Sequence, residues 1–151
     1  MKPTFFIAAA MLVAMLSAAY AGGPADAVRP FYDKVGYETD PEFRAKFVDP
    51  AKSKLEENDK LSGNGEEVGC IDWALSIDAQ DYDEQELAKT LKLSEKEDGD
   101  KATVTATFNL FENQDSAGEV IWSLQKAGGE WKISDIASKT GDWKLSSLDC
   151  Q

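Results

Sequence analysis

The strongest constraint on the fold is a strict alternation of apolar and polar residues over positions 101–111. Five apolar side chains fall on one face of an extended chain, and threonines and an asparagine fall on the other. The apolar set is Ala102, Val104, Ala106, Phe108 and Leu110. A period of two residues is typical of a β-strand that buries one face and leaves the other in water. The segment therefore predicts one strand of an antiparallel sheet.

Further strands follow at short intervals. Val120, Trp122 and Leu124 are aligned within 119–126, and another apolar stretch covers 131–136. The intervening residues 97–100, 114–118 and 128–129 carry the glycines and aspartates that tight turns favour. Strands joined by such short turns form an antiparallel meander.

The first third of the mature chain predicts helices. Apolar residues at helical spacing over 25–34 predict one helix, which Pro30 would limit to short pieces. Asp40-Pro41 and Asp49-Pro50 each combine an aspartate N-cap with a proline suited to the first helical turn, so they predict two more short helices. Helices followed by a curved antiparallel sheet define the α+β class.

The segment 70–77 has its own pattern. Ile71, Trp73, Leu75 and Ile77 alternate with polar or small residues. This alternation predicts a strand, although a short helical turn would also use Ile71 and Leu75.

The N-terminus has the composition of a secretory signal. Lys2 precedes an unbroken apolar run, 5–16, and Ala19-Tyr20-Ala21 places small residues where a signal peptidase cleaves. The run is shorter than the roughly twenty residues that a membrane-spanning helix needs. We expect residues 1–21 to be removed. Residues 22–151 would then be one α+β domain, periplasmic or secreted, with no membrane attachment.

Charge and the lack of histidine narrow the function classes. The formal net charge is −12, and the chain contains no histidine. An acidic surface repels nucleic acid and anionic lipid, whereas it suits a basic protein partner. Histidine-dependent hydrolysis and histidine-ligated zinc are excluded. Carboxylate chemistry, lysine chemistry and binding remain, and we expect no metal and no cofactor.

The two cysteines, Cys70 and Cys150, predict a disulfide bond. An even number of cysteines in an exported chain is typical of structural pairing. Neither a Cys-x-x-Cys motif nor histidine is present to support a redox or metal role.

Several patches resemble a known family. They are Val28–Tyr32, the run GDKATVTATF from Gly99, Asp78–Tyr82 and Glu130–Ile136. Together they resemble the domain-of-unknown-function family numbered 3828, which comprises small exported proteobacterial proteins. The resemblance implies a cystatin-like, nuclear-transport-factor-type cone, in which a curved sheet wraps helices and leaves a pocket at its open end. It implies a fold more than an activity.

The candidate site combines carboxylates with aromatic and amide side chains. Its residues are Tyr32, Asp72, Trp73, Asp78, Gln80 and Asp81. Such a set could bind a ligand in the cone pocket. Alternatively, Asp78 and Asp81 cap a short helix that starts near Glu84, and Gln80 bonds to nearby backbone.

Two function classes follow. The first is a non-enzymatic exported domain that binds a protein partner or a small ligand, in its sharper form an inhibitor or immunity protein that neutralises a basic toxin. The second is an enzyme that uses a carboxylate of the cone pocket as a base, with Tyr32 or Tyr82 as proton donor. We assign no catalytic residue.

Overall fold

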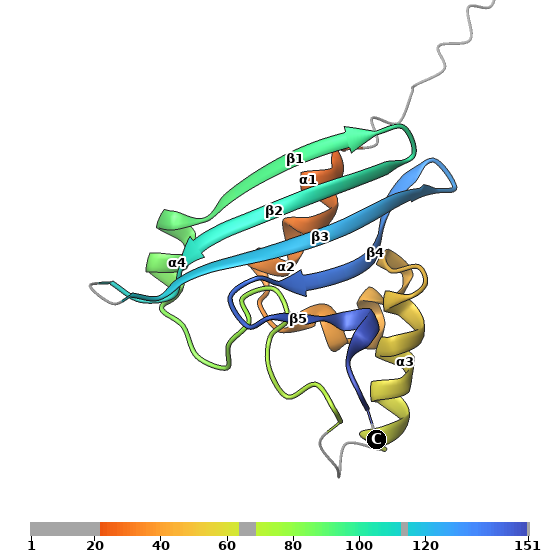
Figure 1. Cartoon of the computed structure of the whole chain (residues 1–151), viewed down its shortest axis with the longest axis horizontal. Coiled ribbons are helices and arrows are strands. Elements are labelled where there is room, and N and C mark those ends of the chain that lie inside the picture. Colours follow the sequence, from red (N-terminus) through yellow and green to blue (C-terminus); the bar gives the residue numbers. More distant parts are fainter. Residues whose placement is uncertain (1–21, 64–68, 113–114, 151) are drawn as a thin grey trace, which may run out of the picture.

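A five-stranded antiparallel sheet carries the structure, with helices packed against it (Figure 1). The computed structural model describes residues 22–63, 69–112 and 115–150, so the expected signal segment lies outside the described residues. The strands follow the chain order across the sheet: β1 (Lys92–Asp98), β2 (Lys101–Asn109), β3 (Ala117–Ala127), β4 (Glu130–Ser138) and β5 (Trp143–Lys144). The sheet does not close into a barrel, and the predicted α+β class is confirmed.

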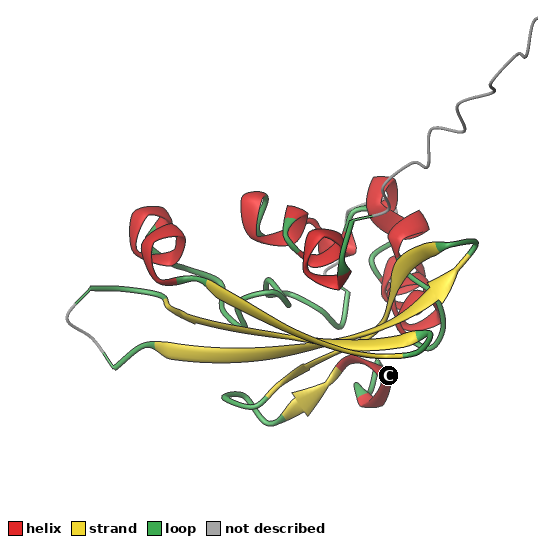
Figure 2. Ribbon diagram, turned by 90° about the horizontal axis from the view of Figure 1, so that it is seen from above, coloured by secondary structure: helices red, strands yellow, loops and turns green. Residues whose placement is uncertain are grey.

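Most helices lie on one side of the sheet, as Figure 2 shows. They are α1 (Pro24–Val28), α2 (Pro30–Asp33), α3 (Ala51–Leu61) and α4 (Glu84–Thr90), with 3₁₀ helices η1 (Tyr37–Thr39), η2 (Pro41–Lys46) and η3 (Leu145–Ser147). Among the described residues, no helix has both the length and the apolar character that crossing a membrane requires.

The alternation in β2 appears in the structure as two different faces. Ala102, Val104, Ala106 and Phe108 are buried against the helices, whereas the threonines between them are exposed or half-buried. Val104 lies opposite Trp122 of β3 in the register. Gly118 lies opposite Phe108, and a Cβ atom at position 118 would collide with the phenyl ring. The predicted facing of this strand is therefore confirmed.

Aromatic side chains join the helical layer to the sheet. The Phe31 ring stacks on Trp122 with centroids 5.4 Å apart. The Trp122 indole N–H donates a hydrogen bond to the Tyr32 hydroxyl over 3.0 Å. Phe43 and Phe47 pack on the same Phe31 ring. These contacts fill the space between α2 and the sheet.

The predicted helix starts are present with local adjustments. Pro30 separates α1 from α2, because its ring and missing N–H interrupt a continuous helix. The Asp40 carboxylate caps η2 by accepting a 2.9 Å bond from the Glu42 N–H. The predicted cap at Asp49 is wrong by one residue: Pro50 is the N-cap of α3, which begins at Ala51, while the Asp49 carboxylate accepts a 3.2 Å bond from the Ser53 N–H.

The predicted strand over 70–77 is wrong. The segment instead consists of bends and a tight turn, which a single bridge between Ala74 and Ala79 closes. Leu75, Ser76 and Ile77 are all buried, which a flat strand with alternating faces does not allow. Ile71, Leu75 and Ile77 enter the core at separate points along this irregular path.

The facing of β2 predicts two very different substitution effects. Phe108→Ala should lower the free energy of unfolding by about 3–5 kcal/mol, since it leaves a cavity against the helices. Thr105→Ala, on the opposite face, should cost well under half as much. Urea denaturation of both variants measures the difference, and equal losses would contradict the assigned facing.

Candidate functional site

The irregular stretch Cys70–Tyr82, here called the 70–82 segment, holds all but one of the predicted site residues. It runs between α3 and α4, after the undescribed residues 64–68. Asp72, Gln80 and Asp81 are exposed on it, whereas Ile71, Leu75 and Ile77 are buried beneath. A loop that keeps polar side chains outside and apolar ones inside can serve as a fixed binding element.

The start of the segment is fixed by a covalent bond and a buried amide. Cys70 is disulfide-bonded to Cys150, as the sequence predicted. The buried Asn58 side chain of α3 accepts a 2.9 Å hydrogen bond from the Ile71 N–H. The segment is therefore tied to the last turns of α3 and to the C-terminal residues.

A buried carboxyl group fixes the middle of the segment. Glu38 of η1 is only 1% exposed, and its Oε1 accepts a 2.8 Å bond from the Ser76 N–H. Its Oε2 has no hydrogen-bond partner among the described residues. Burial raises the pKa of Glu38, and the bonds from Ser76 and nearby backbone lower it by less.

Asp78 fixes the far end of the segment to the sheet. Its backbone has φ of 54°, a conformation that Asp and Asn tolerate better than most residues. Its carboxylate accepts bonds from the Ser138 hydroxyl, over 2.6 Å, and from the Trp143 indole N–H. Trp143 also contacts Trp73 edge to face. Asp78 is therefore engaged in holding the turn.

A surface hollow of about 470 Å³ lies at the base of the segment. Asp72, Trp73, Gln80 and Tyr82 all line it. The Gln80 side-chain amide donates a 3.1 Å bond to the Asp72 carbonyl, which joins the two ends of the turn. Burial raises the pKa of Tyr82, with a smaller contribution from Glu84.

The structure brings only part of the predicted set together. Asp72, Trp73 and Gln80 meet at this hollow, but Tyr32 lies in the core, bonded to Trp122. Asp81 accepts a bond from the adjacent Tyr82 N–H and does not line the hollow. The predicted cap is also corrected: the residue that caps α4 is Asp83, through the Glu86 N–H, because it immediately precedes the helix. The predicted bond from Gln80 to nearby backbone is present.

Sequence reasoning missed Glu38, Ser138 and Trp143, although they fix the segment. Each is remote from it in the chain, and none belongs to a motif. Asn58 gave a weak signal, because it falls on the buried side of α3 between Leu55 and the helix end.

Comparison with known proteins gives a likeness of fold. No family model matches the chain, and no curated protein matches it, so the expected membership of the family numbered 3828 stays a prediction. Among solved structures, the chain is similar to a chain of the type VI native effector–immunity complex Tae3–Tai3 from Ralstonia pickettii. The TM-score is 0.52 at 17% sequence identity, over 79% of this chain and 96% of that chain. The likeness thus concerns the fold alone.

The disulfide bond predicts a measurable contribution to stability. The two cysteines are 80 residues apart, so the bond restricts a long loop in the unfolded chain. Cys70→Ser should lower the free energy of unfolding by about 2–4 kcal/mol. Wild-type protein measured in reductant is the control and should match the variant. Two alkylatable thiols in the native, non-reduced protein would contradict the bond.

The burial of the Glu38 carboxyl group predicts that the free energy of unfolding depends on pH. Its pKa lies above the ordinary value of 4.5 only in the folded state, so the folded protein retains the proton to higher pH. The free energy of unfolding should therefore fall as the pH rises above about 4.5. Glu38→Gln removes this titration and should be more stable than wild type near neutral pH.

The advantage of Glu38→Gln should shrink as the pH is lowered towards about 4. Urea denaturation across this range measures it, with the exposed Glu56→Gln as the matched control. A difference between variant and wild type that does not change with pH would contradict the assigned burial effect.

Proposed function

We propose that this chain is an exported protein-binding inhibitor of the immunity kind, which binds a basic partner protein through the 70–82 segment and neutralises it. The observation that carries the proposal is the fixation of an irregular, exposed segment by residues from remote parts of the chain. Cys150, Asn58, Glu38 and Ser138 each hold one part of it.

A segment fixed before binding loses little conformational entropy when the partner arrives. Ordering a mobile loop costs free energy that would otherwise contribute to affinity. Inhibitors that occupy a partner's cleft avoid this entropy cost, since their free and bound backbones are nearly the same.

The exposed chemistry of the segment suits a cationic partner. Asp72 presents a carboxylate at a hollow that Trp73 and Tyr82 also line. Tryptophan and tyrosine are enriched among the residues that dominate binding energy, and a carboxylate pairs with arginine or lysine. A basic side chain of the partner inserted into this hollow would contact all three groups.

The overall negative charge also favours rapid association with a basic partner. A formal net charge of −12 attracts a basic partner from a distance and raises the association rate. The likeness to a chain of an effector–immunity complex also supports a role in protein binding, although it extends only to the fold.

The enzymatic alternative has less support. It needs carboxylates and a tyrosine converging on one pocket, but the Asp78 carboxylate bonds to Ser138 and Trp143, and the Tyr32 hydroxyl accepts from Trp122. Of the acid–base groups considered, Asp72 and Tyr82 are the two that share the hollow.

A binding and protection experiment tests the proposal. The protein encoded beside this chain, or one captured by it from periplasmic extract, is produced in the periplasm of a test strain with and without residues 22–151. We expect growth inhibition by that protein and rescue by this chain. Asp72→Ala with Asp81→Ala should weaken binding at least tenfold in calorimetry and abolish rescue, at an unchanged melting temperature.

The matched control removes two carboxylates at the far hairpin, Glu97→Ala with Asp98→Ala, both exposed. It should retain binding within about twofold. If both double variants weakened binding equally, the effect would come from the net charge and not from the position of the carboxylates. A captured protein that is not toxic, or rescue by the Asp72 and Asp81 variant, would overturn the proposal.

A further inference from the structure

The face of the sheet opposite the α1 and α2 helices carries a regular array of lysines and threonines. Lys92 and Lys96 of β1 lie directly opposite Thr107 and Thr103 of β2, and Thr105 lies between these threonines. Lys101 begins the same row on β2. These six residues, here called the lysine–threonine face, are exposed or half-buried. Lys92, Lys96 and Lys101 form no ion pair with the other described residues.

The lysines and the glutamates of β1 lie on opposite faces of the strand. Lys92 and Lys96 point away from the helices, whereas Glu95 points towards them and accepts a 2.8 Å bond from the Ala25 N–H of α1. β1 is an edge strand, and charge along an edge prevents pairing with other sheets. Positive or negative charges on either face of the strand would prevent this pairing. The need to protect the edge therefore does not explain why the lysines and the glutamates of β1 lie on opposite faces.

Two carboxylates on this side of the sheet are paired with lysines. Glu119 pairs with Lys139 over 2.8 Å, and Asp135 pairs with Lys144 over 3.2 Å. Asp98, at the hairpin end opposite Lys101, and Asp49, which lines the same hollow as Lys96 and Lys101, are exposed carboxylates near the array. The six residues of the array itself thus include three lysines and no carboxylate, in a protein with a formal net charge of −12.

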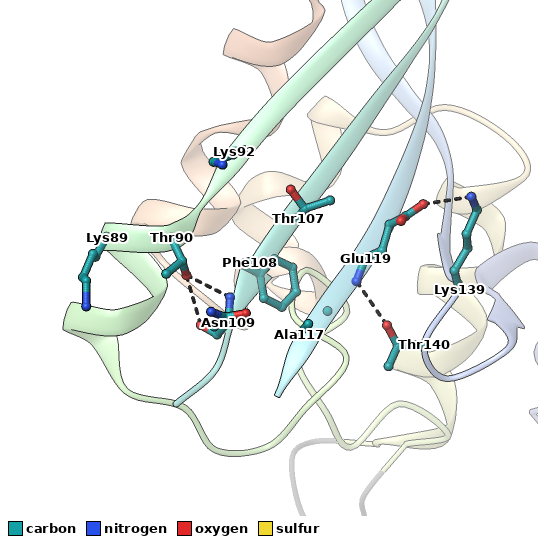
Figure 3. Close-up of a pocket in the computed structure, with 11 residues that line it drawn as sticks. Lys89, Thr90, Lys92, Thr107, Phe108, Asn109, Ala117, Glu119, Lys139 and Thr140 are labelled. Atoms are coloured by element: carbon teal, nitrogen blue, oxygen red, sulfur yellow. Dashed lines mark hydrogen bonds and ion pairs between the residues drawn. The ribbon is translucent and has the colours of Figure 1, made fainter. Parts of the chain in front are cut away.

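Two shallow hollows lie at opposite ends of this face. The larger, of about 690 Å³, is lined by Lys92, Thr107 and Asn109, with two lysines that are already paired: Lys89 with Glu86, and Lys139 with Glu119 on the far side (Figure 3). The other, of about 480 Å³, is lined by Lys96, Lys101 and Thr103, with the carboxylates of Asp49 and Asp98 also on its wall. Lysine ammonium groups and threonine hydroxyls at both ends offer hydrogen-bond donors to carboxylates.

We propose that the lysine–threonine face is a second docking surface, which binds an acidic segment of a partner protein. Charge complementarity identifies the occupant, because unpaired lysines beside hydroxyls match aspartate and glutamate side chains. Nucleic acid fits less well: Arg29 and Arg44, the arginines of the chain, belong to the helical side, and no aromatic ring belongs to the array.

The opposed charges of the face and the whole molecule predict an unusual salt dependence. At about 0.01 M salt the screening length is about 30 Å, so an acidic segment is repelled by the whole protein. At about 0.15 M it is about 8 Å, and the segment senses mainly the nearby lysines. At about 1 M the local attraction is screened as well. Affinity should therefore be highest at the intermediate salt concentration.

Fluorescence anisotropy with a short labelled polyglutamate peptide tests the proposal at these three salt concentrations. We expect binding by residues 22–151 that peaks near 0.15 M. Lys92→Glu with Lys96→Glu should weaken it at least tenfold. Lys34→Glu with Lys60→Glu, which changes the net charge equally at exposed positions elsewhere, should weaken it less than twofold. Should the first pair unfold, Lys92→Gln with Lys96→Gln replaces it.

Several results would overturn the proposal. They are no binding at any salt concentration, equal weakening by both pairs, a steady decline in affinity from low to high salt, and tighter binding of a heparin fragment or of anionic phosphatidylglycerol vesicles. The Asp72→Ala with Asp81→Ala variant should bind the peptide as wild type does. That comparison separates this surface from the 70–82 segment, so either proposal can fail alone.

Discussion

The contact between Trp122 and the second helix determines the layout of the whole molecule. Trp122 is fully buried near the middle of β3, where it stacks on Phe31 and donates its indole N–H to the Tyr32 hydroxyl. The bond satisfies two polar groups that would otherwise be buried without partners. This contact holds α2 on one face of the sheet, while the side chains of β1 and β2 on the opposite face stay exposed or half-buried.

The 70–82 segment depends on polar contacts made at a distance. Asn58, Glu38 and Asp78 each hold it through a hydrogen bond to or from another part of the chain. Buried polar groups contribute little net free energy compared with apolar packing, but they fix one arrangement among several compact ones. A conformation fixed in this way before binding is what an inhibitory segment requires, and this links the network to the proposed function.

The two proposed surfaces carry opposite charges, although the protein as a whole is acidic. The 70–82 segment exposes Asp72 and Asp81, while the open side of the sheet exposes Lys92 and Lys96. A basic partner and an acidic segment could therefore be bound at different places, without competition. The division arises from the two-residue period of β1, which sends its lysines and its glutamates to opposite sides.

The sequence by itself determined the central strands β2, β3 and β4, because the alternation in 101–111 and the glycine turns are local signals read directly from neighbouring residues. It also predicted the cap at Asp40, a helix start within one residue of Asp49, and the disulfide bond. It predicted Asp72, Trp73 and Gln80 as neighbours, but only the tertiary structure separated Tyr32, Asp78 and Asp81 from them. The path of 70–77 was likewise decided by Glu38, Asn58 and Trp143, which lie far away in the chain. Local periodicity cannot reveal such partners, since their contacts exist only after the helices have packed on the sheet.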